Sequence, residues 1–174
     1  MPEKINRGLV QVYTGDGKGK TTAALGLAMR ATGQGMRVGF IQFLKSELCG
    51  EHLFTSQYHP FEIVQVSAGD SVTKPQQQLR EEAQQTLAYA EEQMMSGNYQ
   101  LLILDEVLVA VHKGLITSGQ VLNLLEKKPD SVELVLTGRY APPEIVERAD
   151  LVTEMHMVKH PFNRGVAARR GIEY

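Results

Sequence analysis

The chain has 174 residues, 43% of them hydrophobic and 22% charged, which is typical of one globular domain, here expected to span residues 1–174, and excludes a disordered or fibrous protein. A formal net charge of −2, the lack of Trp and the few aromatic residues argue against a nucleic-acid partner. No apolar run reaches the roughly 20 residues of a membrane span, and the first residues do not form a secretory signal. The single cysteine, Cys49, fits a reducing compartment. We therefore expect a cytoplasmic protein without a membrane partner.

Short apolar runs rich in β-branched residues alternate along the chain with longer helical patterns. This alternation predicts βαβ units, and therefore a three-layer α/β fold with a mainly parallel sheet of five to six strands. We expect the strands at residues 9–13, 37–43, 61–66, 101–104, 133–136 and 151–157.

Four helical patterns separate these strands, and their ends carry the Pro and Gly signals that are usual at helix termini. They cover residues 20–31, residues 75–95, a segment that begins after Thr117-Ser118 and ends before Pro129, and a short segment that Pro142-Pro143 opens and that leads to Asp150. The other long pieces are expected to be irregular, and long loops on a rigid sheet are where ligand contacts usually lie. These pieces are residues 45–60, 67–74 and 159–174.

A glycine-rich turn joins the first expected strand to the first expected helix. Backbone N–H groups at the positive end of a helix dipole complement phosphate charge, so the turn predicts a nucleoside triphosphate site. Lys20 would reach phosphate oxygens, and the Thr21 hydroxyl would coordinate Mg²⁺ held by the same phosphates. Thr14 stands where the usual pattern has its first Gly, and Lys18 fits a phosphate contact and a solvated loop lysine equally well. The expected ATP-binding residues of the loop are Thr14, Gly15, Asp16, Gly17, Lys18, Gly19, Lys20, Thr21 and Thr22.

Two carboxylates follow the apolar run of residues 101–104, at the end of a strand that faces the ligand crevice in open α/β sheets. Either Asp105 or Glu106 could hold Mg²⁺ while the other orients a ligand; the alternative is an acidic strand end in solvent. Arg139 ends a later strand and could neutralise phosphate charge in the same crevice, or be a surface arginine. The basic tail, residues 158–174, could clamp an anionic ligand. No role is assigned to His52, His59, His112 and His156, whose spacing is not that of metal ligands.

Several stretches taken together resemble one family. They are the loop Tyr-Thr-Gly-Asp-Gly-Lys-Gly-Lys-Thr-Thr at residues 13–22, Ile-Gln-Phe-Leu-Lys at 41–45, Leu-Asp-Glu at 104–106, Leu-Thr-Gly-Arg at 136–139, Val-Lys-His-Pro-Phe at 158–162 and Ala-Arg-Arg-Gly-Ile-Glu at 168–173. From about Gly8 onwards the chain is similar to the CobA/CobO/BtuR-type ATP:corrinoid adenosyltransferases, and this resemblance implies a P-loop NTPase-like (RecA-like) domain.

The resemblance implies an enzyme, a cob(I)yrinic acid a,c-diamide or cob(I)alamin adenosyltransferase. Such an enzyme transfers the 5′-deoxyadenosyl group of ATP to the Co(I) of a reduced corrinoid, cobalamin or cobinamide, and releases triphosphate, in adenosylcobalamin biosynthesis or salvage. ATP as co-substrate, Mg²⁺ or Mn²⁺, a homodimer and a flavoprotein reductase are implied with it. By resemblance, Lys20, Thr21 and Glu106 are catalytic, Thr21 and Glu106 ligate the metal, and Arg139 joins the ATP-binding residues. ATP would lie in the loop in the reverse of the usual direction, with its ribose C5′ towards the corrinoid.

The chain departs from the family after the third expected strand. Relatives commonly carry an aromatic pair there, in Gly-Phe-Thr-Trp, thought to displace the lower axial ligand of cobalt, whereas this chain has Gly69-Asp70-Ser71-Val72. Two alternatives stay open. The same loop and carboxylates would support a phosphoryl-transfer enzyme, an ATPase or small-molecule kinase, and the missing aromatic pair would support a non-catalytic nucleotide or corrinoid binding module. The residues implied on the corrinoid side are Gly69, Asp70, Val72, Lys159 and His160.

Overall fold

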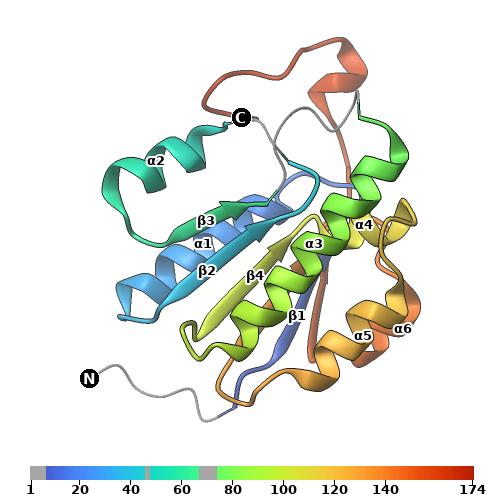
Figure 1. Cartoon of the computed structure of the whole chain (residues 1–174). Helices are drawn as coiled ribbons and strands as arrows, with labels where there is room; N and C mark the ends of the chain where they lie inside the picture. The colour runs from blue at the N-terminus through green and yellow to red at the C-terminus, as the bar shows by residue number, and fades with distance from the viewer. Residues whose placement is uncertain (1–6, 46–47, 67–73) are drawn as a thin grey trace.

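A six-stranded sheet forms the middle layer of the protein (Figure 1). The computed structural model describes residues 7–45, 48–66 and 74–174. The strands run in the order β3-β2-β4-β5-β1-β6, and every neighbouring pair is parallel. They are β1 (Val10–Thr14), β2 (Val38–Gln42), β3 (Glu62–Gln65), β4 (Leu101–Asp105), β5 (Glu133–Thr137) and β6 (Leu151–Glu154). The expected parallel α/β sheet is confirmed, and the largest error at a strand end is in β6, which stops three residues before residue 157.

The central strands are apolar along most of their length because both faces of the sheet are covered. Every residue of β2 and of β4 is buried, as are the last four residues of β5, whereas β6 at one edge is exposed throughout. Parallel strands covered on both faces are nearly continuous apolar runs in the sequence. This is why the apolar runs located the central strands to within one or two residues.

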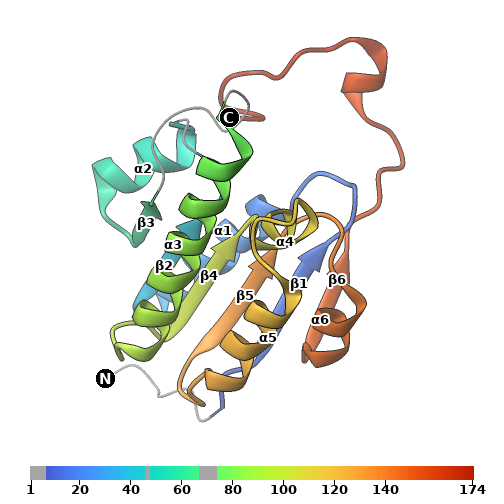
Figure 2. The same cartoon turned by 45° about the vertical axis from the view of Figure 1, so that its right-hand side comes forward.

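Helices cover both faces of the sheet and complete three layers (Figure 2). Ala24, Ala28 and Ala31 of α1 pack on one face, against strand residues that include Phe40 and Ile103. A larger apolar cluster lies on the other face, beneath α3, α4, α5 and α6. The helix bounds are α1 (Lys20–Gly33), α3 (Gln76–Met95), α4 (Val107–His112), α5 (Ser118–Lys127) and α6 (Pro143–Arg148).

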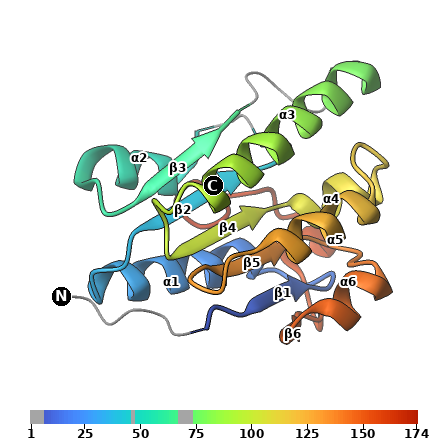
Figure 3. The same cartoon turned by 60° about the horizontal axis from the view of Figure 1, so that its bottom comes forward.

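The helix α2 (Gly50–Tyr58) corrects the expectation that residues 45–60 are irregular. It lies beside β3 at the edge of the sheet (Figure 3), and its first turn is capped because His52 Nδ1 accepts the N–H of Cys49 at 2.9 Å. The pattern did not indicate this helix because Phe54 and Tyr58 are exposed and contact each other instead of forming a buried stripe. The six-residue α4 was missed too, since it is short and its apolar residues begin directly after Glu106.

The carboxyl ends of all six strands meet at one edge of the sheet, and the tail after β6 arches over that edge (Figures 1 and 2). Residues 159–174 are irregular as expected, apart from the short 3-10 helix η1 (Pro161–Arg164). The expected loop at residues 67–74 lies almost entirely outside the described residues. In the part of the chain that the structure describes, no helix is long and apolar enough to cross a membrane.

Ile103→Ala should lower the free energy of unfolding by about 2–5 kcal/mol, because this fully buried side chain fills the layer between β4 and α1. Urea unfolding followed by circular dichroism measures the loss. The control is Met29→Ala on α1, where the side chain is 66% exposed and the change should stay within about 0.5 kcal/mol. Equal losses in the two variants would contradict this description of the core.

Candidate active site

At the carboxyl edge of the sheet, the face that packs against α1 changes from apolar to polar. Side chains two residues apart share a face of a strand, so Gln42 lies on the same face as Phe40, and Asp105 on the same face as Ile103. The strand register places Gln42 beside Gln65 on one side and beside Asp105 on the other. Thr137 of β5 continues the line, and we call Gln65, Gln42, Asp105 and Thr137 the polar row.

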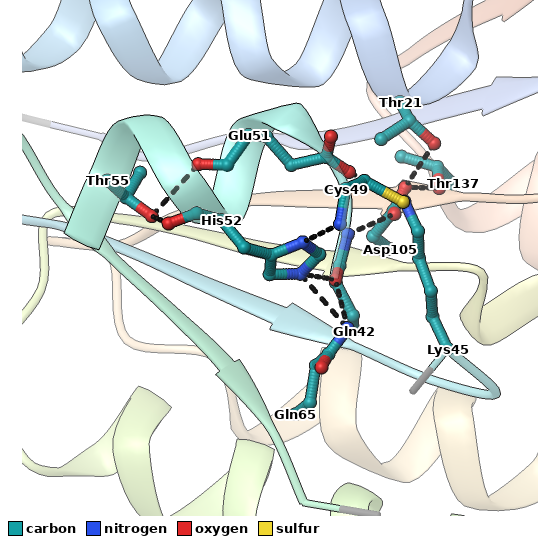
Figure 4. A network of polar contacts seen from close by, with 10 residues as sticks. All are labelled: Thr21, Gln42, Lys45, Cys49, Glu51, His52, Thr55, Gln65, Asp105 and Thr137. Carbon is teal, nitrogen blue, oxygen red and sulfur yellow. Dashed lines mark hydrogen bonds and ion pairs between the residues drawn. The ribbon is translucent and has the colours of Figure 1, made fainter. Parts of the chain in front are cut away.

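The Asp105 carboxylate is the centre of the polar row, and it is fully buried. Its Oδ1 accepts hydrogen bonds from the hydroxyls of Thr21 at 2.9 Å and Thr137 at 2.6 Å, and its Oδ2 accepts one from Gln42 Nε2 at 3.2 Å (Figure 4). Burial raises the pKa of Asp105, whereas the hydrogen bonds from Thr137 and Thr21 favour the ionised form. One carboxylate therefore joins the start of α1 to β2 and β5.

The loop between β1 and α1 curves round the ammonium group of Lys20. Lys20 Nζ donates to the carbonyls of Gly15 and Gly17, each at 2.7 Å, and the side chain is buried. Burial lowers the pKa of Lys20, and the positive charge of Arg139 acts in the same direction. Since α1 has no side-chain cap at its N-terminus, the N–H groups of its first turn are available to a ligand. The loop thus offers a cation and backbone donors to a phosphate chain.

The segment that follows β6 fixes the shape of this loop. Gly15 has a φ of 95°, and a Cβ there would lie 2.3 Å from the carbonyl oxygen of Met155, so a side chain is excluded. The N–H of Gly17 donates to the same carbonyl at 2.7 Å. The Asp16 carboxylate accepts the N–H of Met157 at 3.0 Å, and this bond lowers the pKa of Asp16. The Asp16 carboxylate therefore holds the loop to the segment that leads into the tail.

Glu106 has a left-handed backbone, with a φ of 62°, directly after β4. That conformation costs free energy in a residue with a side chain, and it is held here because the Thr137 hydroxyl accepts the Glu106 N–H at 3.0 Å. Burial raises the pKa of Glu106, and the neighbouring charge of Asp105 raises it further, against the opposing charge of Lys20. The turn directs the Glu106 carboxylate into the same cavity as the loop.

A cavity of about 570 Å³, which we call the main cavity, lies over the carboxyl edge, between the loop, the start of α2 and the tail. Thr14, Gly15 and Asp16 line a neighbouring cavity that shares Arg139 with this one. Lys159 is exposed and does not line the main cavity. The main cavity brings together most of the predicted site residues, whose roles stay predictions. They are Gly17, Lys18, Gly19, Lys20, Thr21, Thr22, Glu106, Arg139 and His160. Those that lie outside the described residues are Gly69, Asp70 and Val72.

One part of the cavity wall was not predicted. Lys45, which follows β2, forms an ion pair of 2.6 Å with Glu51 of α2, and both residues line the cavity. Burial alone would lower the pKa of Lys45, but the hydrogen bond and charge of Glu51 raise it. The position of Lys45 after a buried strand was a signal for it, whereas Glu51 was missed together with α2. Residues 171–174 also line the cavity, and they belong to the basic tail that was expected to be able to clamp an anionic ligand.

Lys18 connects the loop to this end of the tail. Its Nζ donates to the carbonyl of Ile172 and to the Glu173 carboxylate, each at 3.1 Å. Glu173 also accepts hydrogen bonds from the backbone and guanidinium of Arg169. These contacts hold the tail over the cavity.

Oxygen donors suited to a divalent cation lie where the main cavity meets a smaller one of about 270 Å³. Both cavities are lined by Thr21 and Glu106, and hydroxyl and carboxylate oxygens are ligands that Mg²⁺ prefers. A second group, Cys49, Glu51 and His52, has ligand atoms within 4.8 Å of one another. That group is the weaker candidate, because both ring nitrogens of His52 and the Glu51 carboxylate already have partners.

The chain is similar to known proteins over nearly its whole length. A family model described as ATP:corrinoid adenosyltransferase BtuR/CobO/CobP matches residues 6–174. A corrinoid adenosyltransferase of Pseudomonas aeruginosa is 36% identical over 172 residues, which cover 97% of this chain and 84% of that protein. The corrinoid adenosyltransferase CobA of Salmonella typhimurium is 34% identical over 170 residues, and the corrinoid adenosyltransferase of Escherichia coli K12 is 32% identical over 169 residues. Each of these two matches covers 97% of this chain and 86% of the relative.

The Glu173 carboxyl should titrate far below an ordinary glutamate, because the hydrogen bonds from Arg169, with a further one from Lys18, bring its pKa to about 2. Because the pKa of Glu173 is lowered on folding, its ionised carboxylate stabilises the folded tail fully at pH values above the ordinary glutamate pKa of about 4.3. This stabilisation is lost as the pH falls towards about 2. Carboxyl-carbon NMR during an acid titration measures it. The control is Arg169→Ala, in which Glu173 should titrate closer to the ordinary range; an ordinary pKa in the unaltered protein would contradict the tail contacts.

Proposed function

Because this chain belongs to the ATP:corrinoid adenosyltransferase BtuR/CobO/CobP family, we propose that its main cavity binds ATP for transfer of the adenosyl group to a corrinoid. The family resemblance stated from the motifs is confirmed, and the protein is a corrinoid adenosyltransferase. The observation that supports this cavity as the ATP site is the meeting of Lys20, Thr21 and Glu106 on its wall.

Adenosyl transfer leaves little covalent chemistry to the protein. The electron pair of Co(I) in the reduced corrinoid attacks C5′ of ATP, a cobalt–carbon bond forms, and cobalt is oxidised to Co(III). The C5′–O bond breaks, and triphosphate leaves with the bonding electrons. The protein therefore has to bind and orient both substrates and stabilise the leaving charge. We assign that stabilisation to Lys20 and the N–H groups of the loop, with Arg139 adding positive charge.

We assign the metal to Thr21 and Glu106, as Mg²⁺ or Mn²⁺. The support is chemical, since these residues present a hydroxyl and a carboxylate beside the loop, and such hard oxygen donors suit either ion. When bound, the ion supplies positive charge that neutralises the triphosphate. Thr21 is suited to this role because its proton is already donated to Asp105, so that its lone pairs are left for a cation.

The corrinoid side of the site rests on the family resemblance more than on contacts. His160 lines the main cavity, and Lys159 next to it is exposed, so we propose that the corrinoid approaches from the tail. The further residues assigned to that side, Gly69, Asp70 and Val72, lie outside the described residues. Cobalamin or cobinamide as acceptor, a homodimer and a flavoprotein reductase as electron donor complete the proposal.

The reaction products separate adenosyl transfer from phosphoryl transfer. Incubation of the protein with ATP, Mg²⁺ and chemically reduced cobalamin should yield adenosylcobalamin and triphosphate in equal amounts, because each C5′–O bond broken gives one of each. Absorbance of the light-sensitive cobalt–carbon bond and chromatography of the nucleotides measure the two products. ADP and phosphate without a cobalt–carbon bond would show an ATPase or kinase instead, and tight binding without turnover would show a binding module.

Lys20→Ala should reduce adenosyl transfer by about 10²–10³-fold, the usual effect of removing one donor that stabilises a leaving oxyanion. The rate of adenosylcobalamin formation measures it, and circular dichroism shows whether the variant is folded. Lys127→Ala is the matched control, because Lys127 pairs with Glu91 on the surface, away from the cavity, and should transfer at the unaltered rate. Near-normal transfer by Lys20→Ala would refute the assignment.

A further inference from the structure

We propose that His52 is a positioning residue for the metal site, acting through Gln42 and Asp105 on the hydroxyl of Thr21. The proposal rests on the proposed role of Thr21 as a metal ligand. It starts from a continuous line of hydrogen bonds that runs from α2 through the polar row to the start of α1 (Figure 4). His52 does not line the cavity that holds the loop, so its effect would be indirect.

The first step is the tautomer of His52. Its Nδ1 accepts the N–H of Cys49 at 2.9 Å, in the hydrogen bond that caps α2. An accepting Nδ1 carries no proton, so the neutral ring carries its proton on Nε2. That nitrogen lies 2.7 Å from Gln42 Oε1 and therefore donates to it. The helix cap thus determines which way the His52 hydrogen bond runs.

The second step is the orientation of the Gln42 amide, which is fully buried. Its Oε1 accepts from His52 and also from Gln65 Nε2 at 3.0 Å. The two donor nitrogens lie 3.0 Å apart because both converge on this one oxygen. With its oxygen committed to these donors, the amide presents Nε2 to Asp105 Oδ2, at 3.2 Å. A reversed amide would set its oxygen against the carboxylate and its NH₂ against two donors.

The third step is the hydroxyl of Thr21. A hydroxyl has one proton and two lone pairs, and Thr21 gives its proton to Asp105 Oδ1 at 2.9 Å. The lone pairs then face away from Asp105, towards the two cavities that Thr21 lines. The Thr21 hydroxyl keeps this orientation only while the Asp105 carboxylate stays in place to accept its proton, and the Gln42 amide holds that carboxylate by donating to Oδ2. Hydrogen-bond partners of metal ligands commonly set ligand orientation and affinity in this way.

Three substitutions at position 52 separate the steps. His52→Gln keeps an acceptor for the Cys49 N–H and a donor for Gln42, because an amide offers both. His52→Glu keeps the acceptor that caps α2, as glutamate does at this position of a capping box, but has no donor for Gln42. His52→Leu has neither and adds no charge. Thermal unfolding of each variant records its effect on the fold.

The decisive measurement is the affinity for ATP by calorimetry, with Mg²⁺ and with EDTA in its place. His52→Glu should weaken binding by about tenfold with Mg²⁺, the lower end of the effect seen for hydrogen-bond partners of metal ligands, and should change it little in EDTA. His52→Gln should stay within about twofold of the unaltered protein, since it preserves both hydrogen bonds. In a Gln42→Leu background the His52→Glu substitution should have no further effect, because the line is already cut.

The proposal is wrong if His52→Gln and His52→Glu bind MgATP equally, or if His52→Glu loses as much ATP affinity in EDTA as with Mg²⁺. It is also wrong if His52→Glu weakens binding as much in the Gln42→Leu background as in the unaltered protein. Should His52→Glu fail to fold, His52→Leu replaces it in the same comparison with His52→Gln. A protein that forms no adenosylcobalamin, yet shows the Mg²⁺-specific loss, would refute the proposed function and leave the role of His52 intact. A protein that forms adenosylcobalamin, but whose MgATP affinity does not depend on the residue at position 52, would support the proposed function and refute the role of His52.

Discussion

The buried Asp105 carboxylate is the contact on which the carboxyl edge of the sheet depends. A carboxylate taken out of water is unfavourable unless donors surround it, and three side chains from α1, β2 and β5 supply them. The same Thr137 hydroxyl that donates to Asp105 accepts the N–H of Glu106 and so holds the strained turn after β4. Satisfying one charge thereby positions two groups of the proposed metal site.

The strand order explains why side chains have to connect the two halves of the site. The glycine-rich loop follows β1 and the acidic pair lies at the end of β4, but β5 lies between these strands. No backbone ladder joins β1 to β4, so the link runs from Thr21 on α1 and from Thr137 on β5 to a shared oxygen of Asp105. The apolar layer beneath, with Phe40 and Ile103, keeps water away from these hydrogen bonds and strengthens them.

Much of the fold could be predicted because buried parallel strands and glycine turns leave local signals in the sequence. The loop around Lys20, the strand before Asp105 and the position of Arg139 all followed from such signals. α2 could not, since its cap uses His52 and its Phe54 is exposed, and the pairing of Lys45 with Glu51 was lost with it. Nor could the sequence tell which of the two adjacent acids meets Thr21, because that depends on which face of β4 packs against α1.

The tail places an anion of the protein itself beside the glycine-rich loop. Glu173 forms an ion pair with Lys18 at 3.1 Å, so under the proposed function a triphosphate oxygen that approached Lys18 would have to replace a carboxylate. Exposed ion pairs contribute little to stability, so breaking the pair between Lys18 and Glu173 would cost little free energy. Under the proposed function, Glu173 would be the counterion that the triphosphate displaces from Lys18, so the contact between the loop and the tail would depend on whether ATP is bound.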